Sequence, residues 1–182
     1  MSETVTRLLD AAEAKMREAG YHTVSFRDLA ADLGIKSASV HYYFPKKEDL
    51  GVAVVARYRR HFIDNLSSAV ESCDGPNAKL GAVASAFRSA LVTSNKICLC
   101  GVMGAEAQGL PDAVRAELRQ FLVEIADLIE VIYRGTRHPD PNSQALLAVA
   151  AFEGAMILAI NLGEMSVFDR VASALLEKSL AD

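Results

Sequence analysis

Residues Ser25 to Leu50 read SFRDLAADLGIKSASVHYYFPKKEDL, and this stretch decides the fold. Ser25 followed by Asp28 has the spacing of a capping box, which predicts that a helix begins at Phe26. Gly34 supplies the residue that a tight turn needs at positive φ. The stretch therefore opens with one short helix that ends at a glycine turn.

A second short helix follows this turn, and Ser37 is placed to cap it. Two short helices joined by a glycine-containing turn form the helix-turn-helix pattern, here over residues 25–44. In that motif the second helix enters the major groove of DNA. Pro45 then opens a further helix, where free backbone N–H groups together with Lys46 and Lys47 can hold a phosphate.

The rest of the chain shows helical periodicity, so the sequence predicts an all-α fold of about nine helices. No stretch alternates with a period of two for long enough to form a convincing strand. The helix after Pro45 illustrates the pattern, because its apolar residues recur every four positions: Leu50, Val54, Tyr58, Phe62 and Leu66.

The composition excludes several classes of protein. With 182 residues, of which 51% are hydrophobic, the chain is long enough to bury a core and too apolar to be disordered. Its three cysteines, an odd number, argue against a disulfide framework and favour a reducing compartment. The N-terminal segment alternates charged and apolar residues without a hydrophobic signal core, so we expect a cytoplasmic protein.

The charge is distributed unevenly along the chain. The formal net charge is −4, yet residues 1–60 hold ten Lys and Arg against eight Asp and Glu. The remaining residues hold nine against fifteen. This asymmetry is typical of a small anion-binding head on an acidic body. The basic residues of the head also cluster: Lys36, Lys46, Lys47, Arg57, Arg59 and Arg60.

The order of these elements resembles the TetR/AcrR family of one-component transcriptional regulators. A first helix precedes the helix-turn-helix, and Tyr42-Tyr43-Phe44-Pro45 runs into a Lys-Lys-Glu-Asp-Leu helix start. The resemblance covers about residues 5–55 in detail and the rest in helix number and size. It implies a DNA-binding domain in residues 1–50 and a helical effector-binding and dimerisation domain in residues 51–182.

The resemblance also implies roles for particular residues. Arg27 would reach a base or a phosphate, and Tyr42 and Lys47 would clamp backbone phosphates. His41 stands where the family usually has tyrosine, and it either donates to the DNA or is merely exposed. The leading edge of the recognition helix would consist of Lys36, Ser37, Ala38 and Ser39.

The apolar stretch of residues 145–162 is about as long as the shortest membrane spans. Glu153 at its middle would be costly in a bilayer, so we prefer a buried helix and expect no membrane contact. The resemblance implies that the last two helices, at about 142–163 and 165–180, form a homodimer interface. A core helix within one chain is the alternative.

The effector-binding part carries weaker signals. Cys98 and Cys100 are packing residues, thiols that sense or contact a ligand, or metal ligands, although C-x-C is not a zinc-like spacing. Within one helix they would point about 200° apart, which argues against a disulfide between them. Glu106 and Gln108 are pocket groups or a polar surface, and Arg88 is a further ligand-binding candidate. We expect no metal site and no cofactor.

Together these features predict a ligand-responsive transcriptional regulator, a repressor that a small molecule releases from a palindromic operator in double-stranded DNA. A helical enzyme and a protein–protein adaptor are the alternatives. The sequence contains no Glu-x-x-His pair, phosphate-binding glycine loop or Gly-x-Ser-x-Gly elbow, so we expect no catalytic site. An adaptor would not need the arrangement of Ser25–Lys47.

Overall fold

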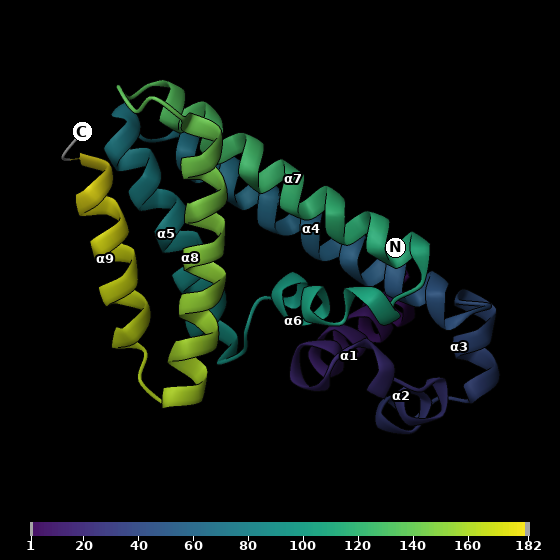
Figure 1. Ribbon diagram of the computed structural model, residues 1–182. Helices are drawn as coiled ribbons and strands as arrows, with labels where there is room; N and C mark the ends of the chain where they lie inside the picture. The colour runs from purple at the N-terminus through teal and green to yellow at the C-terminus, as the bar shows by residue number, and fades with distance from the viewer. Residues whose placement is uncertain (1, 181–182) are drawn as a thin grey trace. The chain divides into compact units, whose positions relative to one another are not determined.

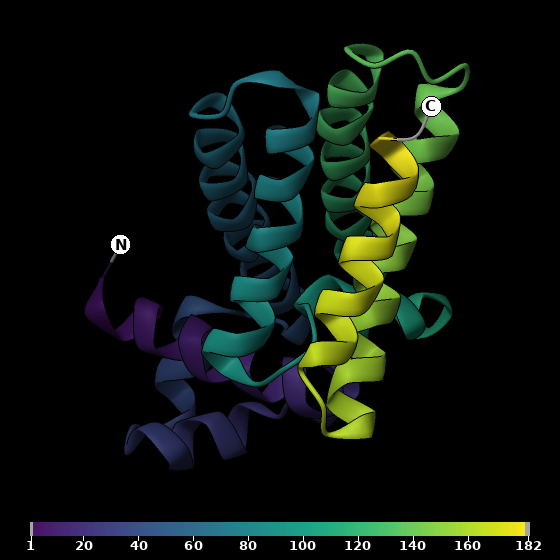
Figure 2. The ribbon, with the colours of Figure 1, turned by 90° about the vertical axis from the view of Figure 1, so that its left-hand side faces the viewer.

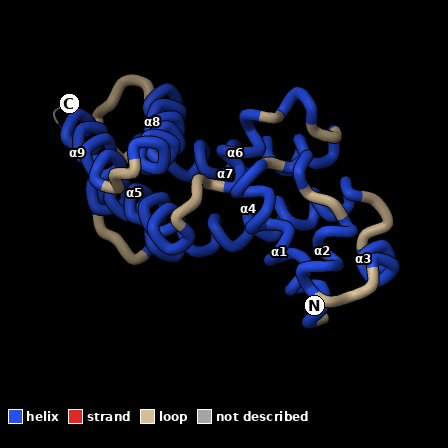
Figure 3. Tube along the Cα trace, turned by 90° about the horizontal axis from the view of Figure 1, so that it is seen from below, coloured by secondary structure: helices blue, strands red, loops and turns tan. Residues whose placement is uncertain are grey.

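The computed structural model describes residues 2–180, which form nine α-helices, two short 3₁₀ helices and no strand (Figures 1 and 3). The predicted all-α fold of about nine helices is confirmed. The elements in chain order are α1 (Glu3–Ala19), η1 (Tyr21–Thr23), α2 (Phe26–Leu33), α3 (Ser37–Tyr43), α4 (Lys47–Glu71), α5 (Gly75–Ser94), α6 (Leu99–Ala105), η2 (Ala107–Gly109), α7 (Asp112–Arg134), α8 (Pro141–Leu162) and α9 (Ser166–Leu180).

The chain folds into two compact units. The first combines the residues up to Arg59 with Leu99–Gln120, so α6 and η2 belong with the N-terminal helices. The second combines Arg60–Cys98 with the residues from Phe121 onward, and both α4 and α7 run through the two units. The boundary at residue 50 between a DNA-binding domain and an effector-binding and dimerisation domain is a functional division, and it stays a prediction.

Local signals set the ends of α2, as the sequence predicts. Ser25 Oγ accepts a hydrogen bond from the backbone N–H of Asp28 at 3.1 Å, and α2 begins at Phe26. Gly34 ends the helix with φ of 66°, in the left-handed region that favours glycine. Its backbone N–H donates to the carbonyls of the last turn.

The cap of α3 differs from the prediction. The helix begins at Ser37, and the N-cap position belongs to Lys36, whose side chain makes no capping hydrogen bond. A residue caps a helix only from the extended position before its first turn, and Ser37 already has helical geometry. The prediction that Ser37 caps the second helix is therefore wrong.

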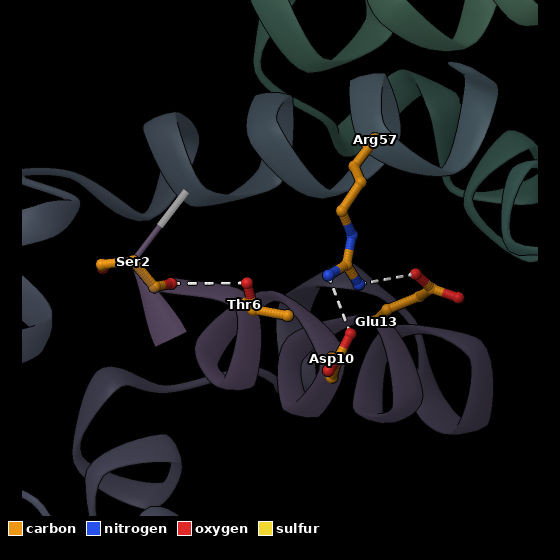
Figure 4. A network of polar contacts seen from close by, with 5 residues as sticks. All are labelled: Ser2, Thr6, Asp10, Glu13 and Arg57. Atoms are coloured by element: carbon orange, nitrogen blue, oxygen red, sulfur yellow. Dashed lines mark hydrogen bonds and ion pairs between the residues drawn. The ribbon is translucent and has the colours of Figure 1, made fainter. Parts of the chain in front are cut away.

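Ion pairs fasten α1 to its neighbours in the first unit. Lys15 Nζ lies 2.8 Å from an Asp32 carboxylate oxygen, which joins α1 to α2. Figure 4 shows Arg57 of α4 reaching α1, where its guanidinium lies 2.8 Å from Asp10 and donates to Glu13 at 3.0 Å. Arg57 is 6% exposed, so this contact is built into the core of the unit.

Phenylalanine rings form the centre of the second unit. Phe87 stacks on Phe152 with 5.2 Å between ring centroids, and Phe152 stacks on Phe168 at 6.1 Å. Phe62 meets Phe87 and Phe121 edge to face at 5.2 and 5.6 Å. These contacts join α4, α5, α7, α8 and α9, and α8 and α9 run side by side (Figure 2).

One face of α8 packs inside the chain and the other faces outward. The inward residues are mainly small: Ala145, Ala148, Phe152, Ala155, Met156 and Ala159. The outward residues are large and apolar: Leu146, Leu147, Ile157, Leu158 and Leu162. By length and composition α8 is the one helix within residues 2–180 that passes as a membrane span, and 33% of its most apolar window is buried.

Candidate functional site

The helix-turn-helix presents α3 with one buried and one open side. Val40 is fully buried and Phe44 nearly so, and these residues close the small core behind the helix. The open side carries polar and small side chains. Lys36, Ala38, His41 and Tyr42 are exposed, and Ser37 and Ser39 are partly exposed. Six of the eight predicted DNA contacts therefore lie together on one short helix and its cap.

Tyr42 is the most exposed large hydrophobic side chain of α3, at 81% of its surface. Its ring meets Tyr43 edge to face at 5.1 Å between centroids. The phenol is therefore free to donate to a group outside the protein, which is the geometry that phosphate binding needs.

The start of α2 lies beside α3. The Phe26 and His41 rings meet edge to face with centroids 4.8 Å apart. The Arg27 side chain is 92% exposed and lies 3.8 Å from Asp28, a distance that adds little in water. His41 thus has a packing contact as well as an exposed edge, and Arg27 is available to reach a base or a phosphate.

Lys47 has contacts inside the first unit. Its Nζ donates to the backbone carbonyl of His22 at 2.9 Å and lies 4.7 Å from the centroid of the Tyr21 ring. Burial lowers the pKa of Lys47, and the negative charge of Glu106 partly opposes this shift. An ammonium carries three donors, so Lys47 retains capacity for a phosphate while it holds the His22 carbonyl.

The N-terminus of α4 is partly satisfied by its own residues. The backbone N–H of Lys46 donates to Asp49 Oδ2 at 2.8 Å, and the carbonyl of Lys46 accepts from Asp49 and Leu50. The Lys46 side chain is exposed. A phosphate at this helix start would meet the Lys46 and Lys47 ammonium groups more readily than a row of free amides.

Two members of the predicted basic cluster do not face outward as free charges. Arg57 is paired with Asp10 and Glu13 (Figure 4), and Arg59 lies 3.3 Å from Glu117. Their charges are neutralised inside the first unit, so the expectation that they add to an anion-binding head is wrong. Lys36, Lys46 and Arg60 remain exposed.

The five predicted ligand-binding residues do not share one cavity. Glu106 and Gln108 line a shallow depression with His22 in the first unit. Arg88 of α5 forms a two-pronged pair with Asp169, at 2.6 and 3.1 Å. Cys98 and Cys100 are buried, form no disulfide and lie on either side of the first residue of α6, so the helix begins between them.

Two features of the second unit were not among the predicted site residues. The first is a cleft of about 360 Å³ between α4, α5 and α7, with an apolar lining that includes Val70, Pro76, Leu128, Val131 and Ile132. Glu71 and Lys79 supply charges at its edge. Helical periodicity identifies apolar faces but not the place where two faces fail to close, so no signal in the sequence marks this cleft.

The second feature is the carboxyl of Glu153, on α8. Both of its oxygens are shielded from solvent, and burial together with the neighbouring Cys98 thiol raises its pKa well above the usual 4.5. The sequence does carry a signal for this group, since Glu153 is the single charged residue of the 145–162 stretch. Within residues 2–180 no three His, Cys, Asp or Glu side chains gather as metal ligands.

Comparison with known proteins shows which families and solved structures this fold resembles. Residues 8–54 match the family model of bacterial regulatory proteins, tetR family. The crystal structure of a TetR transcriptional regulator from Legionella pneumophila is 29% identical, covers 98% of both chains and superimposes with a TM-score of 0.86. A TetR-family regulator from Agrobacterium tumefaciens is 24% identical, covers 96% of both chains and has a TM-score of 0.90.

A relative with an assigned role is the fatty acid metabolism regulator protein of Bacillus subtilis. It is 23% identical over 129 residues, which make up 71% of this chain and 60% of that protein. The family model covers the helix-turn-helix, and the structural likeness extends over both units. Residues 8–54 are therefore a tetR-family DNA-binding domain, and the described chain has the fold of solved TetR-family transcriptional regulators.

Proposed function

We propose that this regulator binds a palindromic operator as a homodimer, represses transcription there, and leaves the DNA when a small molecule binds. The observation that carries the proposal is the open side of α3, where polar side chains surround an exposed Tyr42 while Val40 anchors the helix from behind. This is the presentation that a recognition helix needs to reach base edges in the major groove.

The residues divide by the kind of contact that they suit. Arg27 and Ser39 are assigned to base edges, where lost contacts change the preference among sequences. Tyr42, Lys47 and the exposed His41 are assigned to backbone phosphates, which position the protein without reading sequence. The leading edge that enters the groove consists of Lys36, Ser37, Ala38 and Ser39.

The outward face of α8 supports the homodimer. Leu146, Ile157 and Leu158 are exposed in the single chain, although a helix that is apolar nearly all round is normally buried. A second copy that covers this face would also supply a second recognition helix. Two-fold symmetry then matches two half-sites about one DNA turn apart.

The effector is proposed to be a small, mainly apolar molecule. The cleft between α4, α5 and α7 is apolar and carries few charges, and the curated relative regulates fatty acid metabolism. The segment from Cys98 to Gln108 remains the other proposed place of effector action, through thiol modification or noncovalent contact. A coupling of about 1–3 kcal/mol suffices for a change of roughly five- to 150-fold in DNA affinity.

A gel-shift titration against the DNA upstream of the chain's own gene tests the proposal. The regulator predicts a salt-dependent shift at submicromolar protein that excess random duplex does not abolish. TetR-family regulators are as a rule transcription factors without enzymatic activity. We also propose that this regulator acts in the cytoplasm. Absence of any specific shift, or equal binding to every duplex, would favour the helical enzyme or the adaptor.

A further inference from the structure

A carboxylate from the α6–η2 segment holds the turn that leads into the helix-turn-helix. Glu106 follows the last residue of α6, and its Oε2 accepts a hydrogen bond of 2.9 Å from the backbone N–H of Tyr21. The two residues are 85 positions apart in sequence, and both belong to the first unit. Glu106 therefore joins a distant part of the chain to the turn between α1 and α2.

The absence of a side chain at Gly20 leaves room for this carboxylate. Its φ of 86° and ψ of 171° fall in a region that is essentially restricted to glycine. A Cβ added to Gly20 would overlap Glu106 Oε1, so the carboxylate occupies the space that any other residue would fill with its side chain. The backbone of Gly20 and the carboxylate of Glu106 thus fit together at close range.

Lys47 holds the same turn. Its Nζ donates to the His22 carbonyl at 2.9 Å and lies 4.7 Å from the centroid of the Tyr21 ring, while the charge of Glu106 acts on the Lys47 ammonium. On the Glu106 side, a Cβ added to Gly109 of η2 would lie 3.1 Å from His22 Nε2, so η2 also packs closely on the turn.

The position of this turn determines where the helix-turn-helix begins. η1 ends at Thr23, and Ser25 caps α2 two residues later. α6 packs against α1, and Glu106 directly follows the last residue of α6, so the hydrogen bond to Tyr21 ties the end of α6 to the turn before α2.

We propose that Glu106 is a positioning residue for operator binding: its hydrogen bond to the Tyr21 amide sets the presentation of α2 and α3. This inference rests on the proposed function. It assigns Glu106 to positioning of the helix-turn-helix rather than to contact with the effector.

The test compares three variants of the full-length protein. Glu106→Ala removes the acceptor, and Glu106→Gln retains a carbonyl oxygen that can still accept from Tyr21. Glu117→Ala is the matched control, because it removes another half-buried glutamate of the same unit, one that pairs with Arg59 at 3.3 Å. Each variant is measured by amide hydrogen exchange at Tyr21. Its affinity is measured for the duplex that the wild type selects from a random pool and for random duplex.

Glu106→Ala is expected to speed exchange at Tyr21 and to lower the affinity for the selected duplex by about tenfold, while the affinity for random duplex stays unchanged. Glu106→Gln is expected to keep most of the selectivity, and Glu117→Ala all of it. General loss of folding would lower both affinities alike. Wild-type selectivity in Glu106→Ala, or an equal loss in Glu106→Gln, overturns the proposal. If the wild type itself selects no duplex, the proposed function fails first.

Discussion

Arg57 illustrates how burial decides the contribution of a single ion pair. The Arg57 side chain is 7% exposed, while its two partners differ, since the Glu13 side chain is 23% exposed and that of Asp10 is 64% exposed. Water screens the Asp10 contact and leaves the Glu13 contact stronger. Moreover, Arg57 Nε has no hydrogen-bond partner within the described residues, so the guanidinium depends on these carboxylates.

Glu13→Ala should therefore lower the free energy of unfolding by about 2 kcal/mol, because it leaves a buried guanidinium with fewer partners. Asp10→Ala should lower it by about 0.5 kcal/mol, as for an exposed pair. Urea denaturation of both variants gives the comparison. Equal costs for the two substitutions would mean that burial does not rank these contacts.

Glu153 makes the stability of the second unit depend on pH. Burial and the Cys98 thiol hold its pKa in the folded chain well above the value of 4.5 that the unfolded chain has. The folded chain therefore binds this proton more tightly, and the contribution of Glu153 to stability is complete below about pH 4.5. That contribution is lost as the pH rises toward the pKa of the folded state.

Glu153→Gln should remove this dependence, because an amide stays neutral at every pH. Relative to the wild type, the variant should gain stability as the pH rises above about 4.5, until the pH passes the raised pKa of Glu153 in the folded chain. Melting temperatures across the pH range measure the effect. A constant difference between the two proteins at all pH values would show that Glu153 does not titrate in this way.

At the scale of elements, the two short helices of the helix-turn-helix differ in how they begin. Ser25 caps α2 through its side chain, whereas Lys36 precedes α3 without such a bond. Ser25→Ala should cost about 1 kcal/mol of unfolding free energy. Ser37→Ala, the matched change at the start of α3, should cost only a few tenths. Similar costs in denaturation experiments would contradict this assignment of the caps.

Local chemistry explains which elements were predictable. The Ser25 cap and the Gly34 turn depend on residues a few positions apart, and sequence spacing finds them. The link from Glu106 to Tyr21 joins residues 85 positions apart, so no spacing rule marks it. From its positive charge alone, Arg57 was grouped with the anion-binding residues. Its ion pairs with Asp10 and Glu13 depend on tertiary packing, so the sequence could not reveal that its charge is neutralised.

The ligand-binding candidates show the same limit. The sequence singles out Cys98, Cys100 and Arg88 by their chemistry, but burial covers both thiols and Asp169 pairs with Arg88. The apolar cleft, in contrast, is lined by ordinary core residue types that no motif distinguishes. Faces of helices were predictable from periodicity, and the gaps between those faces were not.

For the whole molecule, α8 governs the proposed assembly. Its small residues, such as Ala155, pack within the chain, while Leu158 and its neighbours face outward. The proposed dimer contact therefore uses the large outward residues of α8, because its alanines are buried within the chain. Substitution of Ala155 by a large residue would disturb the core of the chain and would not report on assembly.

Leu158→Arg should convert the dimer to a monomer without loss of helix content, since it places a charge in the contact between copies. Val131→Arg is the control, because Val131 is an exposed apolar residue of α7 that does not belong to the outward face of α8, and its substitution should leave the dimer intact. Sedimentation velocity at micromolar concentration separates the two species. A wild type that sediments as a monomer would contradict the proposed assembly.

The central claim is that a two-fold pair of α3 helices reads duplex DNA, and selection from a random duplex pool tests it most directly. The account predicts enrichment of a palindrome with half-sites about one turn apart. It also predicts that Lys47→Ala weakens binding to all sequences and flattens the salt dependence of binding by about one unit. A pool that yields no palindrome, together with binding that is indifferent to salt and sequence, would contradict the account.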